Sequence, residues 1–222
     1  MMASRSEIAR FNMVEQQIRP WEVINPRVLT LMETLPREAF VPEEYADLAY
    51  ADIEIPIGQG QRMMFPRVEA RLLQALDPQP GERALEVGTG SGYLTACLAH
   101  LAQEVVSVDL HPEFIESATA KLAQQNIKNV ALLSADALAA PADDASYDVI
   151  AVTGSLPTRA QADIFCRQLA PGGRLFVVIG SAPVMECLLI TRDHANNLKE
   201  EPLFETELSP LEHAITPVAF EF

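Results

Sequence analysis

The sequence predicts an α/β fold, in which a doubly wound, mostly parallel sheet follows an N-terminal helical extension. From about residue 80 onward, short apolar runs alternate with segments of helical spacing, which favours parallel strands covered by helices on both faces. The 222 residues contain no Gly/Ser/Pro-rich linker and no internal repeat, so one core is expected. We expect residues 1–80 to form the extension and a glycine-containing loop, and residues 81–222 to form the core of the same domain.

The extension contains two segments of helical spacing, residues 7–18 and 25–35, followed by an irregular stretch over 36–52. Pro66 opens a further helix over residues 66–76, because proline suits the first turn of a helix. The stretch "GQGQRMMFP", residues 58–66, predicts a loop before this helix. Its glycines and glutamines suit closure around a small ligand.

Five apolar runs predict the strands of the core. They are "RALEVG" (83–88), "EVVSVD" (104–109), "VALLSA" (130–135), "YDVIAVT" (147–153) and "GRLFVVIG" (173–180). Segments of helical spacing lie between them, over residues 91–102, 111–126 and 156–169. After Ser181 the periodicity weakens, and two strands, 185–193 and 214–222, are expected at an antiparallel end of the sheet.

The composition argues against several classes of function. A formal charge of −15 disfavours a nucleic-acid partner, since such binding depends on Lys and Arg contacts with phosphates. The N-terminal residues lack an apolar signal core, and the apolar runs are too short to cross a bilayer, so we expect a cytoplasmic protein without membrane contact. The three cysteines and four histidines have no disulfide or metal-ligand spacing, and no metal site is expected. The oligomeric state is left open.

A glycine-rich turn joins the first core strand to the first core helix. Gly88, Gly90 and Gly92 stand where a doubly wound sheet holds its ligand, and glycine lets the backbone approach that ligand closely. Asp109 ends the second strand, where a carboxylate can accept hydrogen bonds from both hydroxyls of a ribose. Asp136 ends the third strand, near the expected position of an adenine ring. Together these residues predict an adenosine-containing ligand.

Glycine spacing and local charge favour S-adenosylmethionine over NAD as this ligand. The turn reads GxGxG rather than the dinucleotide pattern GxGxxG, which cradles a pyrophosphate at a helix N-terminus. Glu86, just before the glycines, suits a positively charged ligand. S-adenosylmethionine carries a sulfonium and an ammonium group.

With these residues in place, the sequence resembles a known family. The glycine turn is similar to the first motif of class I methyltransferases, which have a Rossmann-like sheet, and the wider pattern resembles protein-L-isoaspartate O-methyltransferases. The resemblance covers roughly residues 13 to 181. It is carried, in order, by "MVEQQI", "PREAFVP", "AYAD", "IPIGQGQ", "LEVGTGSGYLTACLA", "VVSVD", "YDVIAVTGSLP" and "QLAPGGRLFVVIG".

The resemblance implies a cytoplasmic repair enzyme that transfers a methyl group from S-adenosylmethionine to the side-branch carboxylate of isoaspartyl residues in a protein or peptide. Cofactor contacts are expected from Glu86, Gly88, Thr89, Gly90, Gly92, Asp109, Leu110, Asp136 and Ala137. Contacts with the acceptor are expected from Gln59, Gln61 and Thr153.

The chain departs from the family pattern just after "GQGQ". Where the family has Thr, an apolar residue and a Ser that meets the reacting carboxylate, this chain has Arg62, Met63 and Met64. A carboxylate is already ionised at neutral pH, so it needs orientation rather than a general base. Arg62 is able to orient it through a bidentate hydrogen bond. We therefore treat Arg62, and Met64 in the place of the serine, as the candidate catalytic positions.

This departure leaves three hypotheses for the function. In the first, methyl transfer to a carboxylate survives with Arg62 as the anchor. In the second, the acceptor is a different, more apolar molecule that the methionines line. In the third, the protein binds S-adenosylmethionine without transferring its methyl group. The alternative to all three is that these residues have only a structural role. Arg62 is then a solvated charge, and Met63, Met64 and Phe65 pack in the core.

Overall fold

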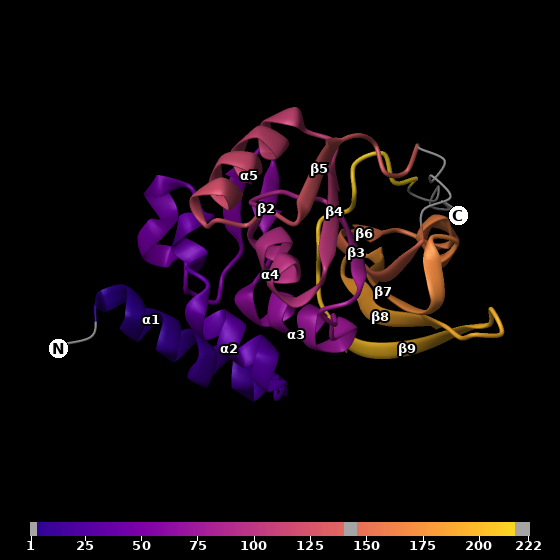
Figure 1. Ribbon diagram of the computed structural model, residues 1–222, viewed down its shortest axis with the longest axis horizontal. Helices are drawn as coiled ribbons and strands as arrows, with labels where there is room; N and C mark the ends of the chain where they lie inside the picture. Colours follow the sequence, from indigo (N-terminus) through magenta and orange to yellow (C-terminus); the bar gives the residue numbers. More distant parts are fainter. Residues whose placement is uncertain (1–3, 140–145, 216–222) are drawn as a thin grey trace, which may run out of the picture.

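The computed structural model describes residues 4–139 and 146–215. Helix α1 (Arg5–Met13) begins with a capping box between Ser4 and Glu7. It runs on into a π-helical turn (Val14–Ile18) and a 3₁₀ turn (Arg19–Trp21). Helix α2 (Pro26–Thr34) follows, and Figure 1 shows both helices at one end of the molecule. The predicted irregular stretch contains only 3₁₀ turns, at Arg37–Ala39 and Glu43–Leu48.

The predicted glycine-containing loop is a small β-hairpin. Strand β1 (Ile55–Gly58) pairs antiparallel with β2 (Gln61–Met63), and the pair forms a two-stranded sheet apart from the main one. Gln59 and Gly60 make the tip, both with positive φ. Helix α3 (Pro66–Leu76) then begins at Pro66, as predicted.

The main sheet has seven strands in the order β5-β4-β3-β6-β7-β8-β9. Five of them run parallel: β3 (Arg83–Val87), β4 (Glu104–Asp109), β5 (Val130–Ser134), β6 (Tyr147–Leu156) and β7 (Leu169–Ser181). At the other end, β8 (Val184–Arg192) pairs antiparallel with β7, and β9 (Leu198–Glu205) pairs antiparallel with β8. The predicted α/β fold with a doubly wound, mostly parallel sheet is confirmed.

Helices cover the sheet unequally. Helix α3 packs on β6 and β7, α4 (Tyr93–Leu101) on β4, and α5 (Pro112–Gln124) on β4 and β5. On the other face lie a 3₁₀ turn (Arg159–Ala162) and the four-residue helix α6 (Asp163–Cys166). Of the helix predicted over 156–169, only residues 159–166 are helical, and the first four of these form a 3₁₀ turn.

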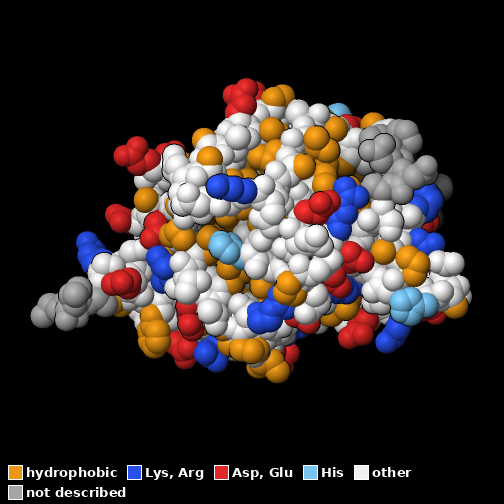
Figure 2. Space-filling view, viewed as in Figure 1, with side chains coloured by type: hydrophobic (Ala, Val, Ile, Leu, Met, Phe, Trp, Pro, Cys, Tyr) orange, Lys and Arg blue, Asp and Glu red, His pale blue; other side chains and the backbone are white. Residues whose placement is uncertain are grey.

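Strand alternation divides the core into two clusters. In β3, Ala84 joins the cluster under α3 and α4, whereas Leu85 and Val87 join the cluster on the opposite face. Within the described residues, no helix is both long and apolar enough to span a bilayer. Side chains of both charge signs are scattered over the face drawn in Figure 2.

The C-terminal end differs in part from the prediction. The strand expected over 185–193 is β8, but its antiparallel partner is β9, which the sequence reading missed. Of the strand expected over 214–222, residues 214 and 215 lie outside any strand and the remainder lies outside the described residues. Residues 207–214, which we call the strap, follow β9 and cross the carboxyl end of β6, where Ser155 pairs with Pro210.

Candidate functional site

A cleft with about 780 Å³ of empty space, partly open to solvent, lies outside the carboxyl ends of β3, β4, β5 and β6. The chain leaves β5 at one edge and returns to place β6 beside β3, and a sheet binds ligands where its strand order reverses in this way. One wall consists of the glycine turn and the residues that follow β4 and β5. The other consists of the β1–β2 hairpin with Glu54 and of the strap.

The glycine turn faces this cleft with backbone rather than side chains. Gly88 has φ of +96°, and a Cβ there would lie 2.1 Å from Thr153 Oγ1. The Thr153 hydroxyl donates to the carbonyls of Val87 (2.9 Å) and Gly88 (2.8 Å). Gly90 has φ of +49°, and its Cβ would lie 3.1 Å from Ile57 of the hairpin. The turn therefore requires glycine, and Thr153 fastens it to the end of β6.

Asp109 ties the end of β4 to the glycine turn. Its Oδ2 accepts from the amide of Gly90 and its Oδ1 from the amide of His111, both at 2.9 Å. Each carboxylate oxygen keeps a second lone pair for a ligand hydroxyl. Leu110 lies beside it on the cleft wall.

Asp136, after β5, lines the cleft together with Ala137. Its Oδ1 accepts from the amides of Leu138 (2.9 Å) and Ala139 (3.3 Å), and its Oδ2 lies 2.7 Å from Nδ1 of His213 in the strap. This contact with His213 is the main cause that lowers the pKa of Asp136, and it raises the pKa of His213. The pair is thus a carboxylate facing a readily protonated imidazole.

The structure corrects the expected position of Glu86. Alternation along β3 turns its side chain to the face under α4, where it is fully buried and accepts hydrogen bonds from Thr95 and from Ser107 (2.5 Å). Burial is the main reason that its pKa rises to about 8. Glu86 therefore lies away from the cleft, in surroundings that favour its protonated form, and not beside the ligand as expected.

Two other predicted cofactor residues, Thr89 and Gly92, pack on the side of the glycine turn that faces away from the cleft. Thr89 is buried, and its Oγ1 lies 2.6 Å from Oγ of Ser107. Gly92 precedes α4 with φ of +83°, and a Cβ there would lie 3.0 Å from Cβ of Ala118. Neither Thr89 nor Gly92 lines the cleft.

Gln61 and Arg62 of the hairpin line the cleft, as does Thr153 at the end of β6, whereas Gln59 is exposed at the hairpin tip and does not. Arg62 is exposed, and within the described residues its guanidinium has no hydrogen bond and no ion pair within 4 Å. Glu54 lies near it: burial raises the pKa of Glu54, Arg62 lowers it and Glu207 raises it further. Arg62 is therefore an available donor on the cleft wall.

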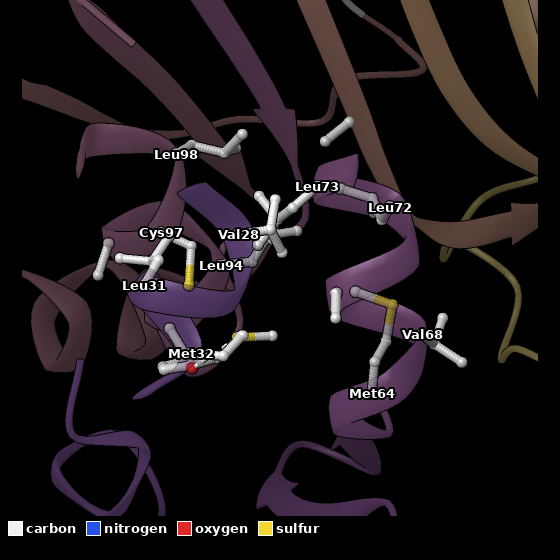
Figure 3. Close-up of a cluster of buried hydrophobic side chains, with 14 of the residues drawn as sticks. Val28, Leu31, Met32, Met64, Val68, Leu72, Leu73, Leu94, Cys97 and Leu98 are labelled. Carbon is white, nitrogen blue, oxygen red and sulfur yellow. Dashed lines mark hydrogen bonds between the residues drawn. The ribbon is translucent and has the colours of Figure 1, made fainter. Parts of the chain in front are cut away.

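Met63 and Met64 do not reach the cleft. Their side chains are 4% and 5% exposed, and Met64 points inward among Val68 and Leu72 of α3 (Figure 3). The Met64 carbonyl accepts from buried Arg37 (2.7 Å), which also forms an ion pair with buried Glu69. The candidate catalytic position at Met64 is thus corrected to a packing position, because the backbone after β2 turns this side chain into the core.

The strap forms the outer wall of the cleft. Ser155, at the end of β6, donates its amide to Ser209 O and accepts from the Leu211 amide, both at 2.9 Å, while its hydroxyl donates to Leu208 O at 2.9 Å. Leu211 packs so closely on Gly154 that a Cβ on that glycine would lie 2.6 Å from Leu211 Cδ2. Residues 208–212 consequently line the cleft.

The residues present fit S-adenosylmethionine. The glycine turn leaves backbone open to the cleft, Asp109 and Asp136 present carboxylates to the nucleoside side, and Phe114 and Leu138 add apolar wall. Four carboxylates, those of Glu54, Asp109, Asp136 and Glu212, line the cleft with Arg62. Such a balance suits a cationic ligand. The described residues contain no group of three or more His, Cys, Asp or Glu arranged to hold a metal ion.

Comparison with known proteins identifies the family. The family model for protein-L-isoaspartate (D-aspartate) O-methyltransferase matches residues 9–213. The chain belongs to this family. It is 36% identical over 202 residues to the protein-L-isoaspartate O-methyltransferase of Koribacter versatilis, covering 91% of this chain and 90% of that one. It is 38% identical over 204 residues to that of Syntrophus aciditrophicus, covering 91% and 93%.

A solved structure shows the same fold as this chain. A protein-L-isoaspartate O-methyltransferase from Plasmodium falciparum, solved in complex with S-adenosyl-L-homocysteine, matches with a TM-score of 0.76 and 20% identity over 95% of this chain and 99% of that one. The family predicted from the sequence, the S-adenosylmethionine-dependent O-methyltransferase activity and the cofactor are confirmed.

Sequence reasoning missed His111 and Glu212, which line the cleft, and His213, which contacts the cleft residue Asp136. His111 directly follows the predicted segment Asp109–Leu110, so that it could have been found as the cap of the next helix. The strap gave no such signal, because its residues make irregular structure whose position depends on contacts with β6.

Proposed function

We propose that this protein methylates the side-branch carboxylate of isoaspartyl residues in proteins or peptides, and that Arg62 holds that carboxylate. S-adenosylmethionine supplies a methyl group on a sulfonium; the carboxylate supplies the electron pair, so that an oxygen–carbon bond forms as the carbon–sulfur bond breaks, and no proton is transferred. The protein's part is to hold the two reactants in line and to exclude water.

The observation that carries the proposal is the position of Arg62. Its guanidinium lies on the wall of the same cleft as Gly88 and Asp109, and it has no hydrogen-bond partner among the described residues. A guanidinium binds a carboxylate through two parallel hydrogen bonds, which fixes the orientation as well as the position of the acceptor. Gln61, on the same hairpin, lines the cleft beside Arg62 and is proposed to add a polar contact for the acceptor, while Thr153 lines the cleft at the end of β6.

On the cofactor side, Asp109 and Asp136 are proposed to hold the nucleoside, with Gly88, Gly90, Leu110 and Ala137 forming the wall around it. Asp109 is already oriented by two backbone amides, so it needs no rearrangement to accept ribose hydroxyls. Glu86, Thr89 and Gly92 support the turn rather than touch the cofactor.

The second hypothesis, an apolar acceptor, loses its main support. It required Met63 and Met64 to line the acceptor side, but both side chains are buried in the core. The third hypothesis, binding without transfer, rested on the missing serine. The guanidinium of Arg62, which makes no hydrogen bond to another described residue, offers an alternative way to orient the acceptor.

We propose a cytoplasmic site of action, in keeping with protein repair. The three cysteines are free and buried, as is usual for proteins that fold in a reducing compartment.

The decisive experiment measures transfer of labelled methyl from S-adenosylmethionine to an isoaspartyl peptide, with the corresponding aspartyl peptide as the control. We expect labelling of the isoaspartyl peptide alone. Arg62→Ala should lower kcat/KM by about tenfold to a hundredfold, because a hydrogen bond to a charged group contributes roughly 1.5–3 kcal/mol. Arg62→Lys should retain part of the activity, since it keeps the charge without the paired donors.

The matched control is Arg5→Ala, an exposed arginine outside the cleft. Affinity for S-adenosylhomocysteine, measured by calorimetry, should be the same in wild type and in Arg62→Ala. Unchanged turnover in Arg62→Ala would remove Arg62 from the mechanism. Tight cofactor binding with no labelled peptide would favour the third hypothesis.

A further inference from the structure

The side chain of Glu212 joins three parts of the molecule. Its Oε1 accepts from Nε2 of Gln61, on strand β2, and lies within hydrogen-bond distance of Nε2 of His111, the residue before α5, both at 2.8 Å. Glu212 itself belongs to the strap. One carboxylate oxygen thus connects the hairpin that carries Arg62 with the segment that carries Asp109.

The strap holds Glu212 in place from both sides. On one side, the amide of Leu211 donates to Ser155 O at 2.9 Å. On the other, His213 contacts Asp136 at 2.7 Å. The carboxylate of Glu212 is consequently fixed over the cleft by neighbours that are themselves bound to the main sheet.

The β1–β2 hairpin has few other attachments. Its base is packed, with Ile55 and Met63 buried, but its tip is exposed. Among the described residues, the bond from Gln61 to Glu212 is the only side-chain hydrogen bond made by residues 55–63. A two-stranded hairpin outside a larger sheet is only marginally stable. The tip, and Arg62 beside it, therefore depend on Glu212 for a fixed position.

We propose that Glu212 is a positioning residue: it holds the outer part of the β1–β2 hairpin against His111, and so sets the position of Arg62 over the cleft. The inference deepens the proposed function, because it assigns the residue that places the acceptor-binding side chain. Glu212 is expected to act through Gln61 rather than by touching the acceptor carboxylate, which a second negative charge would repel.

The first test measures hydrogen exchange of the backbone amides in residues 58–62, without any substrate. Glu212→Ala should accelerate their exchange about threefold to tenfold, as expected for the loss of a hydrogen-bonded contact at an exposed site. Glu212→Gln keeps an oxygen acceptor and should restore most of the protection. Glu205→Ala, at the end of β9 and away from the cleft, is the matched control and should match wild type.

A double variant separates the direct contact from a general loosening of the strap. If Glu212 acts through Gln61, then Gln61→Ala alone should accelerate exchange as much as Glu212→Ala, and the combination should add nothing. Unchanged exchange in Glu212→Ala, or equal acceleration in Glu205→Ala, would overturn the proposal. Additive effects of the two substitutions would do the same.

The second test uses catalysis. Glu212→Ala should raise KM for the isoaspartyl peptide about threefold to tenfold, with kcat at saturating peptide nearly unchanged, because a bound acceptor can still draw Arg62 into place. A fall in kcat with constant KM would contradict a positioning role. If no variant and no wild-type protein methylated the peptide, the proposed function would fail, while the exchange measurements would still decide the role of Glu212.

Discussion

At the scale of single residues, the molecule separates side chains that are adjacent in sequence. Glu86 and the glycines that follow it look like one ligand-binding group in the sequence, yet Gly88 and Gly90 face the cleft and Glu86 faces the core. A strand turns successive side chains to opposite faces, and only the packed sheet decides which face is the core. Met64 is a similar case. Its side chain follows the packing of α3 and not the place that the family pattern gives to a serine.

The buried Glu86 leads to a prediction about stability. Its pKa of about 8 in the folded protein lies above the ordinary value of 4.5, mainly through burial, so the folded state keeps a proton that the unfolded state loses. The contribution of Glu86 to the free energy of unfolding therefore falls as pH rises between 4.5 and about 8. The fall is up to about 1.4 kcal/mol for each pH unit.

Glu86→Gln, which is neutral at every pH, should escape this loss. Urea unfolding from pH 5 to pH 8 should show the variant gaining stability relative to wild type as pH rises. A constant difference between the two proteins across this range would mean that Glu86 is ionised in the folded state. Ser107→Ala provides a comparison that removes a hydrogen-bond donor to Glu86 without changing any titratable group.

At the scale of elements, periodicity predicted the five parallel strands and most helices, because buried strands and amphipathic helices have strong local patterns. It did not predict the β1–β2 hairpin or β9. The hairpin strands have four and three residues, too short for a period to be visible. Strand β9, "LKEEPLFE", is mostly exposed and carries charges and a proline, so its pairing with β8 depends on the sheet rather than on its own sequence.

The contact between the glycine turn and β6 gives a prediction at this scale. Gly88→Ala places a methyl group 2.1 Å from Thr153 Oγ1 and forces a non-glycine residue to a φ of +96°. We expect a loss of stability and of S-adenosylhomocysteine affinity by at least tenfold.

The double variant Gly88→Ala/Thr153→Ala removes the closest contact and should recover part of both losses, leaving the backbone strain. Calorimetric titration and thermal unfolding measure the two effects. If Thr153→Ala gave no recovery, the contact with the hydroxyl would not be the cause. Gly81→Ala, where a Cβ meets nothing within 4 Å and φ is not positive, serves as the control.

At the scale of the whole molecule, the extension and the core share one interior. A single hydrophobic cluster runs from Met13 and Leu31 through Leu72 of α3 to Val149 and Cys187 of the main sheet. Arg174 of β7 adds a polar link: it binds Glu82 at 2.7 Å and the carbonyls of Asp77 and Leu76 at the end of α3. The sequence predicts that residues 1–80 and 81–222 form one domain. Unfolding experiments can test this prediction directly.

We expect the two parts to unfold in a single transition, with equal calorimetric and van't Hoff enthalpies. Arg174→Ala should lower the free energy of unfolding by about 2–4 kcal/mol, since it leaves Glu82 and two carbonyls without their partner in a half-buried place. The transition should nevertheless stay single. Arg167→Ala, an exposed arginine of the neighbouring segment, is the control. Two resolved transitions in wild type would show that the extension is a separate unit.

The last strand of the sheet has a consequence for association between copies of the protein. An open sheet edge offers unpaired amides and carbonyls to any extended chain, and so promotes aggregation. In β9 that edge carries Lys199, Glu200 and Glu201, followed by Pro202, which has no amide hydrogen to offer and lies where the pairing with β8 shifts register. A second copy that approached this edge would have to desolvate these charged side chains and would meet an interrupted ladder. Strand β9, which the sequence pattern did not predict, thus protects the sheet against pairing with the sheet of another copy.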